Sequence, residues 1–313
     1  MGQQRVQHID IAKGVGIILV VWLHFPILSG LNKFDNWGGY ITSFYMVLFF
    51  MLSGVFFKRT SLTKRIRRLM QPYICFYLMA CVYYTLVSFL KHTPMECSHY
   101  LLPFLGATEG YENTPIWFLL SLTQIICICF ALYIIRNRYV VLLAAFCVSI
   151  TGYFLGRYNV PYYIDVSMLC VFPFVLGYEL RDIILYIKPK VGFSAGLLSM
   201  GCYAMFPGLT NVSQNFEPMG YVPFLIISVG ASLFVVSVSE MISRTALGTG
   251  LAFFGKNSLI ILCTHMMLMT LPAVMGRYIG DVWLANILGL MLVMAIECLV
   301  IAVIKKYAKF LIV

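Results

Sequence analysis

A histidine deep in the first apolar stretch of the chain is the residue whose position most directly suggests chemistry. His24 follows Lys13 by eleven residues, in a run that opens with Asp10. In an α-helix this separation is close to three full turns and about 16 Å of rise, so Lys13 and His24 share one stripe of the helix. Asp10 lies within about 40° of the same stripe. A titratable side chain at membrane depth is costly, and it therefore indicates a functional site.

Two interpretations of this stripe remain open on the residues alone. His24 lies too deep to reach the membrane surface, so its ring either bonds a neighbouring helix or transfers protons, for which histidine is well suited near neutral pH. Lys13 either anchors the helix at the cytoplasmic headgroups or serves the same site as His24.

Two basic residues further along the chain are spaced to share a ligand. Arg65 and Arg68 lie three residues apart, on one face of a short helix. Such a pair binds phosphate oxygens well, but it also suits contact with anionic lipids. Pro72 follows and suits the first turn of the third membrane helix.

Other polar or aromatic residues punctuate the apolar segments. Ser53 and Gly54 close the second segment, where small residues allow helices to pack closely. Trp117 opens the fourth segment, a position typical of the aromatic belt at a membrane interface. His265 is a second buried histidine, and Glu297 is a lone carboxyl group that needs a partner or a proton. No metal site is predicted, since Cys127 and Cys129 point to different faces of a helix.

The composition identifies the class of protein. The 313 residues are 61% hydrophobic and 11% charged, with a mean hydropathy of +0.89. These values exclude an ordinary soluble domain and a disordered chain. We therefore expect an all-α polytopic membrane protein of about ten transmembrane helices, with residues 1–313 forming one transmembrane domain. The segments run near residues 9–29, 40–57, 71–90, 115–135, 139–156, 161–179, 191–207, 221–240, 257–276 and 282–304.

The distribution of positive charge predicts the orientation in the membrane. With the N-terminus in the cytoplasm, all but four of the 22 Lys and Arg residues lie on the cytoplasmic side, the exceptions being Lys33, Lys91, Arg157 and Arg277. Both termini are then cytoplasmic. The net charge of +10 has this topological origin, so no nucleic-acid partner is expected. The longest loops, 91–114 with Glu112 and 208–220, lie outside, and their carboxylates, amides and aromatic residues suit sugar contact but also suit any solvated loop.

The order of these motifs resembles acyltransferase family 3, a family of integral-membrane O-acyltransferases. The resemblance rests on Asp10, Lys13 and His24, on Leu48–Gly54, on Arg65, Arg68, Pro72 and Tyr73, on Trp117–Leu119, and on Gly255, Ser258 and His265. The run Ile9–Val21 is most similar to the fucose-4-O-acetylase-like branch. The chain departs from the family pattern at Lys13, where arginine is commoner, at Tyr45 and Val47, where the branch usually has His and Pro, and at Leu120, where Pro is frequent.

The resemblance implies transfer of an acetyl or similar short acyl group from acetyl-CoA to a hydroxyl of a cell-surface glycan or lipid-linked sugar. It implies no permanently bound cofactor, and a multi-pass protein surrounded by the lipids of the cytoplasmic (inner) membrane. His24 would be the base or an acylated intermediate, Lys13 would hold a coenzyme phosphate or the thioester oxygen, and Asp10 would orient Lys13. The coenzyme contacts would be Arg65 and Arg68. The acceptor contacts would be Trp117, Glu112, His265 and Glu297.

Two other classes of function remain as alternatives. In a secondary transporter or flippase for a polar or lipid-linked solute, buried His and Glu residues would form a proton relay. That class favours charged residues spread over several helix centres and broken helices in both halves of the chain. A membrane sensor or scaffold would need no buried histidine.

Overall fold

The computed structural model describes residues 6–25, 36–59, 61–92, 97–107, 113–158, 160–208 and 220–312, and within these ranges it contains helices and no strands. The α-helices are α1 (Gln7–Leu23), α2 (Asn36–Val55), α3 (Leu62–Leu90), α4 (Trp117–Leu132), α5 (Arg138–Leu155), α6 (Ile164–Glu179), α7 (Arg181–Leu185), α8 (Pro189–Met205), α9 (Tyr221–Met241), α10 (Ala246–Lys256), α11 (Ser258–Thr264), α12 (Thr270–Tyr278) and α13 (Val282–Tyr307). The 3₁₀ helices are η2 (Cys97–Leu105), η3 (Thr114–Ile116), η4 (Gly156–Tyr158), η5 (Pro161–Tyr163), η6 (His265–Leu268) and η7 (Lys309–Leu311).

The described helices fit a multi-pass membrane protein. Seven of them are long and apolar enough to cross a membrane, and the bent pair of α10 with α11 and η6 raises the number to eight. Helices α1 and α8 are shorter, with 17 residues each. The all-α membrane fold is therefore confirmed, whereas the expected total of about ten crossings and the orientation of the termini stay predictions.

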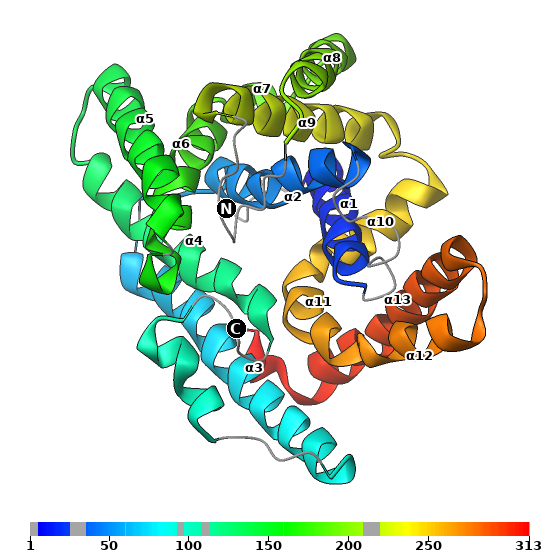
Figure 1. Cartoon of the computed structure of the whole chain (residues 1–313). Coiled ribbons are helices and arrows are strands. Elements are labelled where there is room, and N and C mark those ends of the chain that lie inside the picture. Colours follow the sequence, from blue (N-terminus) through cyan, green and yellow to red (C-terminus); the bar gives the residue numbers. More distant parts are fainter. Residues whose placement is uncertain are drawn as a thin grey trace.

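The helices are arranged around the motif-bearing elements. In Figure 1, α1, α2, α4 and α11 lie around the middle of the bundle, and α5, α8 and α12 lie at its periphery. Helix α1 packs along α10 and also contacts α2 and α11. Residues from the first, second, fourth and ninth predicted segments thus meet in one place.

Glycine allows two pairs of helices to touch backbone to backbone. A Cβ on Gly54 of α2 would lie 1.9 Å from the Phe174 carbonyl oxygen of α6, and a Cβ on Gly177 of α6 would lie 2.0 Å from the Met51 carbonyl oxygen of α2. In the same way, Gly255 of α10 faces the backbone of α1, where a Cβ would lie 1.7 Å from the Asp10 carbonyl oxygen. Such close approach requires glycine.

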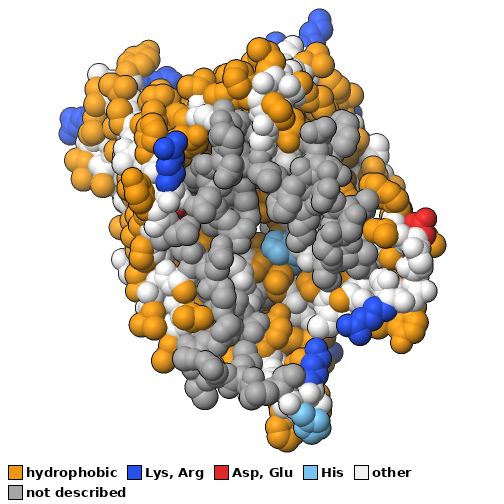
Figure 2. Space-filling view, viewed as in Figure 1, with side chains coloured by type: hydrophobic (Ala, Val, Ile, Leu, Met, Phe, Trp, Pro, Cys, Tyr) orange, Lys and Arg blue, Asp and Glu red, His pale blue; other side chains and the backbone are white. Residues whose placement is uncertain are grey.

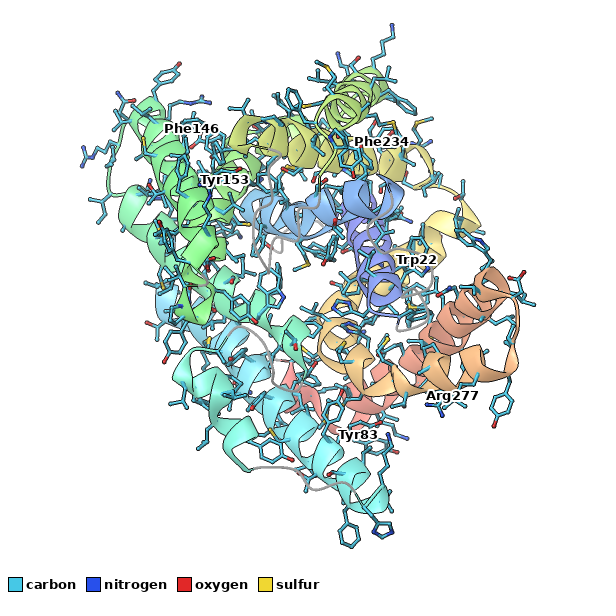
Figure 3. All side chains as sticks on the ribbon, viewed as in Figure 1. Trp22, Tyr83, Phe146, Tyr153, Phe234 and Arg277 are labelled. Carbon is cyan, nitrogen blue, oxygen red and sulfur yellow. The ribbon has the colours of Figure 1, made fainter. Side chains whose placement is uncertain are left out.

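Aromatic side chains hold the outer helices. Phe234 of α9 packs edge-on against Phe193 of α8 with ring centroids 5.2 Å apart, while Phe146 and Tyr153 of α5 both contact Tyr221 of α9 (Figure 3). These rings bury apolar surface without any charged group. Aromatic packing therefore holds α5 and α8 against α9.

The third helix begins earlier than the sequence predicts. Helix α3 starts at Leu62, so Pro72 lies inside the helix and the prediction that it occupies the first turn is wrong. The residues before Pro72 are mostly Lys, Arg, Leu and Met, which favour helix strongly. The basic segment is therefore an extension of a 29-residue helix.

The predicted segment 257–276 is not one continuous helix. It is divided into α11, η6 and α12, and α10 meets α11 at a bend of 61° at Asn257. The Asn257 side chain donates to the Phe253 carbonyl oxygen at 2.7 Å and so satisfies one of the carbonyls at the bend. Broken helices within a membrane occur where the backbone is buried or lines a cavity. Helix α11 and its neighbours are therefore candidate walls of a cavity.

Candidate active site

His24 stands at the C-terminal end of α1. The helix ends at Leu23, and the Nδ1 atom of His24 lies 2.7 Å from the Val20 carbonyl oxygen. A carbonyl oxygen can only accept, so Nδ1 carries the hydrogen and donates it. In the neutral ring the lone pair is then on Nε2, which is the form of imidazole that can take up a proton.

His265 repeats this arrangement on another helix. It follows Thr264, the last residue of α11, and its Nδ1 donates to the Ile261 carbonyl oxygen at 2.8 Å. The side chain is fully buried, with 0% exposure, and its Nε2 has no hydrogen-bond partner among the described residues. His265 therefore also presents a lone pair on Nε2.

The two histidines are in contact. Their ring centroids lie 5.1 Å apart, and the rings meet edge to face at 71°. Each ring sits at a helix C-terminus, where the partial negative charge of the helix favours a cation. Two imidazolium rings this close would repel each other strongly in a poorly solvated site. The pair is thus suited to hold one proton in transit.

One face of the molecule presents a histidine side chain. Figure 2 shows a pale-blue histidine side chain near the middle of this face, whereas the Lys and Arg side chains visible in the same view lie at the periphery. His24 itself is half-buried. The ring of His24 is therefore not sealed from its surroundings and can meet a small polar ligand.

Glu297 supports this region from α13. It is fully buried, and the Oγ1 atom of Thr264 lies 2.9 Å from both of its carboxyl oxygens and 2.9 Å from the Ile260 carbonyl oxygen. The sequence predicts that this carboxyl group needs a partner, and Thr264 supplies one. Glu297 therefore contacts Thr264, the residue that directly precedes His265 in the chain.

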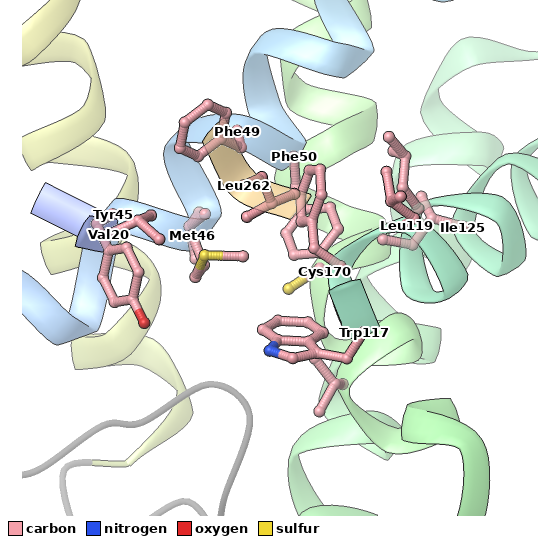
Figure 4. Packing of buried hydrophobic residues seen from close by; sticks show 14 of the residues in the cluster. Val20, Tyr45, Met46, Phe49, Phe50, Trp117, Leu119, Ile125, Cys170 and Leu262 are labelled. Atoms are coloured by element: carbon pink, nitrogen blue, oxygen red, sulfur yellow. The ribbon is translucent and has the colours of Figure 1, made fainter. Parts of the chain in front are cut away.

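A cavity lies along the Lys13 side of α1. Its volume is about 190 Å³, and its walls come from α1, α2, α3, α4 and α11. The lining residues are Lys13, Ile17, Met46, Phe49, Ser53, Leu69, Phe118, Leu119, Leu122, Ser258, Leu259 and Leu262. Figure 4 shows Met46, Phe49, Leu119 and Leu262 from these walls as part of the surrounding apolar packing. The cavity is mainly apolar with three polar side chains, which is typical of a ligand site.

Close helix packing positions the polar lining of this cavity. Gly54 on α2 touches α6, and the adjacent Ser53 reaches the cavity with its hydroxyl donating to the Phe49 carbonyl oxygen at 2.7 Å. Gly255 touches α1, and Ser258 lines the cavity immediately after the bend. Both motifs thus use glycine for packing and a nearby serine for the cavity.

Lys13 is the cation of the cavity. Its Nζ atom lies 5.4 Å from the centroid of the Phe56 ring, in a cation–π contact, and the side chain is half-buried. Such a contact contributes about 0.5–2 kcal/mol and keeps the ammonium group near the wall. Lys13 can therefore face an anionic or carbonyl group in the cavity.

The predicted arginine pair lies beside the cavity but does not line it. Arg65 is half-buried with its guanidinium over the Phe57 ring at 5.3 Å, and Arg68 is exposed. Leu69, the next residue of α3, is part of the cavity wall. The pair thus flanks the cavity at the start of α3.

The remaining predicted residues are placed as follows. Asp10 is buried in the first turn of α1, where Gly255 packs against its carbonyl group. Trp117 is also buried and stacks on Tyr163 with centroids 5.4 Å apart, so it is a core residue here and not part of an exposed aromatic belt. Glu112 lies outside the described residues.

Sequence reasoning missed two residues that hold α11. Thr264 bonds Glu297, and Asn113 donates from Nδ2 to the Cys263 carbonyl oxygen at 2.9 Å. Asn113 is buried and adopts a left-handed backbone conformation with φ of 56°. A signal was available, because an Asn directly before Thr-Pro is typical of a turn that opens a helix.

Comparison with known proteins decides the family. The family model of the acyltransferase 3 domain matches residues 6–304, which is nearly the whole chain. The chain belongs to the acyltransferase 3 family. No curated protein and no solved structure matches it significantly.

Membership in the acyltransferase 3 family agrees with the geometry. Lys13, Ser53 and Ser258 from the motifs line the cavity, and His24 and His265 form the histidine pair, whereas Arg65, Arg68 and Trp117 lie outside both. The chain is therefore a multi-pass membrane acyltransferase. Helix α1 carries Lys13 in the cavity wall, and His24 of the histidine pair directly follows its last residue.

Proposed function

We propose that this protein transfers an acetyl or similar short acyl group from acyl-CoA to a hydroxyl of a cell-surface glycan or lipid-linked sugar. The observation that carries the proposal is the position of His24. Its Nδ1 is committed to the Val20 carbonyl oxygen, so Nε2 keeps its lone pair at the far end of the helix stripe that begins at the Lys13 cavity. A hydroxyl is a weak nucleophile and needs such a base in its transition state.

The donor enters from the cavity side. The apolar walls suit the acyl group and the alkyl parts of the pantetheine arm, and Lys13, Ser53 and Ser258 supply polar contacts along it. Arg65 and Arg68 lie next to the wall residue Leu69 and would bind the coenzyme phosphates. Asp10, one helical turn before Lys13, would orient the ammonium group.

One proton passes from the acceptor hydroxyl to His24 and then from His24 to the leaving thiolate. His24 Nε2 takes the hydroxyl proton while the hydroxyl oxygen bonds to the thioester carbonyl carbon. The carbon–sulfur bond then breaks, and the coenzyme thiolate recovers the proton from the imidazolium. The C-terminal ends of α1 and α11 favour the positive charge that the histidine pair carries in between. Glu297 would lie on the acceptor side of this scheme, whereas Trp117 is packed in the core and stays, like Glu112, an expectation from the sequence.

The proposed location is the cytoplasmic (inner) membrane, with both termini in the cytoplasm. The positive-inside distribution of Lys and Arg supports this orientation. The coenzyme is a cytoplasmic molecule, and the basic start of α3 then faces it.

Mass analysis of surface glycans tests the proposal in cells. Cells with the wild-type protein should carry an acyl mass increment that cells without it lack. The variant His24→Asn should lose the increment, because the Asn amide can still donate to the Val20 carbonyl oxygen but has no basic nitrogen. Asn257 and Asn286 already make the same bond to the carbonyl four residues earlier. A normal increment with His24→Asn would reject His24 as the base.

A further inference from the structure

The lone pair of His265 needs a donor that the described protein does not provide. His265 Nε2 is buried without a hydrogen-bond partner among the described residues. Leaving a buried acceptor unpaired is unfavourable, so such a group indicates a ligand or water that completes it. The hydroxyl of the neighbouring Thr264 is already engaged with the Glu297 carboxyl group and the Ile260 carbonyl oxygen.

A second unpaired acceptor belongs to the same end of α11. Asn113 donates from Nδ2 to the Cys263 carbonyl oxygen, and its Oδ1 is buried without a partner among the described residues. Two acceptors therefore stand at the last turn of α11, one on Asn113 and one on His265. A ligand that satisfies them must bring hydrogen-bond donors.

The chemistry of the reactants selects which ligand this is. The thioester group of the donor has only acceptors, so it cannot pair with a lone pair on nitrogen or oxygen. The hydroxyl that is acylated has one hydrogen, and in the proposed reaction that hydrogen goes to His24. Neither reacting group therefore leaves a hydrogen for His265 Nε2, and a further donor next to the reacting hydroxyl would be within its reach, because the two ring centroids are 5.1 Å apart.

We propose that His265 Nε2 binds a second hydroxyl of the acceptor, on the carbon next to the one that is acylated, so that the enzyme selects vicinal diols. The inference rests on the proposed function and adds the substrate class to it. His24 takes the proton of one hydroxyl, and the neighbouring hydroxyl donates to His265. His265 is then a specificity-determining residue, and the acceptor is a sugar or similar polyol with adjacent hydroxyl groups.

The variant His265→Asn separates this role from a structural one. The Asn amide can keep the bond to the Ile261 carbonyl oxygen, as Asn257 and Asn286 do in their own helices, but it places no acceptor at the position of Nε2. The variant His265→Gln restores an acceptor oxygen near that position. Accumulation in the membrane and thermal stability serve as the folding control for both variants.

The test uses purified protein in detergent, acetyl-CoA labelled in the acetyl group, and methyl glycosides of common hexoses and 6-deoxyhexoses. The glycoside that is acylated is then compared with its monodeoxy analogue lacking the neighbouring hydroxyl. In the wild type, the analogue should lose about 10- to 100-fold in kcat/KM, as expected for one buried hydrogen bond. With His265→Asn, the full glycoside should lose a similar factor, and the analogue should lose little more. His265→Gln should recover part of the discrimination.

The possible outcomes test the role of His265 separately from the acyl transfer itself. Undiminished discrimination between glycoside and analogue in His265→Asn overturns the assignment of His265, while the acyl transfer itself stands. Equal rates for glycoside and analogue in the wild type overturn the vicinal-diol selectivity. Absence of label on every glycoside and on isolated surface glycan, with a folded wild-type protein, overturns the proposed function and this inference with it.

Discussion

At the scale of single residues, hydrogen bonds fix the tautomer of both histidines in the site. His24 and His265 each donate from Nδ1 to a carbonyl oxygen of their own helix, and this choice leaves the basic nitrogen on the other side of the ring. Thr264 gives Glu297 a partner, so the carboxyl group is not an isolated buried charge. The site thus contains two imidazoles and a lysine held by short local contacts.

Lys13 should act on the donor and not on the acceptor. Replacing it with Met removes the cation of the cavity while keeping a long apolar side chain, so KM for acetyl-CoA should rise about 10-fold, equivalent to ~1.4 kcal/mol. The variant Lys13→Arg keeps the charge and should stay within about 3-fold of the wild type. Steady-state kinetics with labelled acetyl-CoA measure both values. An unchanged KM for Lys13→Met would assign Lys13 to membrane anchoring.

At the scale of helices, glycine contacts determine where the polar residues end up. Gly54 and Gly255 allow α2 and α10 to touch α6 and α1, and Ser53 and Ser258 then face one cavity. The bend at Asn257 turns α11 toward the end of α1, where His265 meets His24. Small motif residues therefore act by packing, and their polar neighbours act in the cavity.

Substitution of the packed glycines should destabilise the protein. In Gly54→Ala and Gly255→Ala the added Cβ would lie 1.9 Å and 1.7 Å from a backbone oxygen, so the helices must separate. A loss of about 1–3 kcal/mol is expected, seen as a lower Tm in detergent and lower accumulation. Gly250→Ala on the same helix as Gly255, and Gly201→Ala on α8, are matched controls because nothing lies within 4 Å of their added Cβ. Equal stability of all four variants would contradict this packing.

The first two turns of α3 should govern coenzyme affinity. The double variant Arg65→Ala and Arg68→Ala should raise KM for acetyl-CoA about 10-fold or more, since charge-assisted contacts to phosphate are lost. The effect should shrink as salt is added, because exposed charges are screened. The double variant Lys188→Ala and Lys190→Ala, two exposed residues at the start of the peripheral helix α8, is the matched basic control. If both double variants behave alike, the arginines serve topology only.

The sequence predicts much of this site, and the parts it misses have a physical reason. Spacing along a single helix places Lys13 and His24 on one stripe, and burial cost identifies His265 and Glu297 as residues that need partners. Spacing cannot predict that His24 meets His265, because the contact joins helices that are 241 positions apart in the chain. The bend at Asn257 and the early start of α3 depend on tertiary packing and on the helix preference of a basic segment, and neither is visible in hydropathy.

At the scale of the whole molecule, the family and the apolar helices indicate a multi-pass membrane acyltransferase. Seven to eight helices of the described chain are suited to cross the membrane, and the acyltransferase 3 match spans residues 6–304. In the proposed reaction, a donor from the cytoplasm and a carbohydrate acceptor would approach the bundle from opposite sides. The Lys13 cavity and the histidine pair lie along the same helix between them.

The proposed orientation, with both termini in the cytoplasm, rests on the distribution of Lys and Arg. Epitope tags placed at the N-terminus and at the C-terminus should both resist protease added to the outer side of the cytoplasmic membrane in spheroplasts, and both should be cleaved after lysis. A soluble periplasmic protein and a soluble cytoplasmic protein serve as controls. Cleavage of either tag in intact spheroplasts would contradict the positive-inside assignment.

Transfer of label by purified protein tests the central claim most directly. Wild-type protein in detergent, supplied with acetyl-labelled acetyl-CoA and isolated surface glycan, should place label on the glycan and release free coenzyme thiol in equal amounts. The folded variant His24→Asn should lower the rate by at least about 100-fold, as expected when a general base is lost. Label on the glycan at the wild-type rate with His24→Asn, or no label with the wild type, would contradict the account.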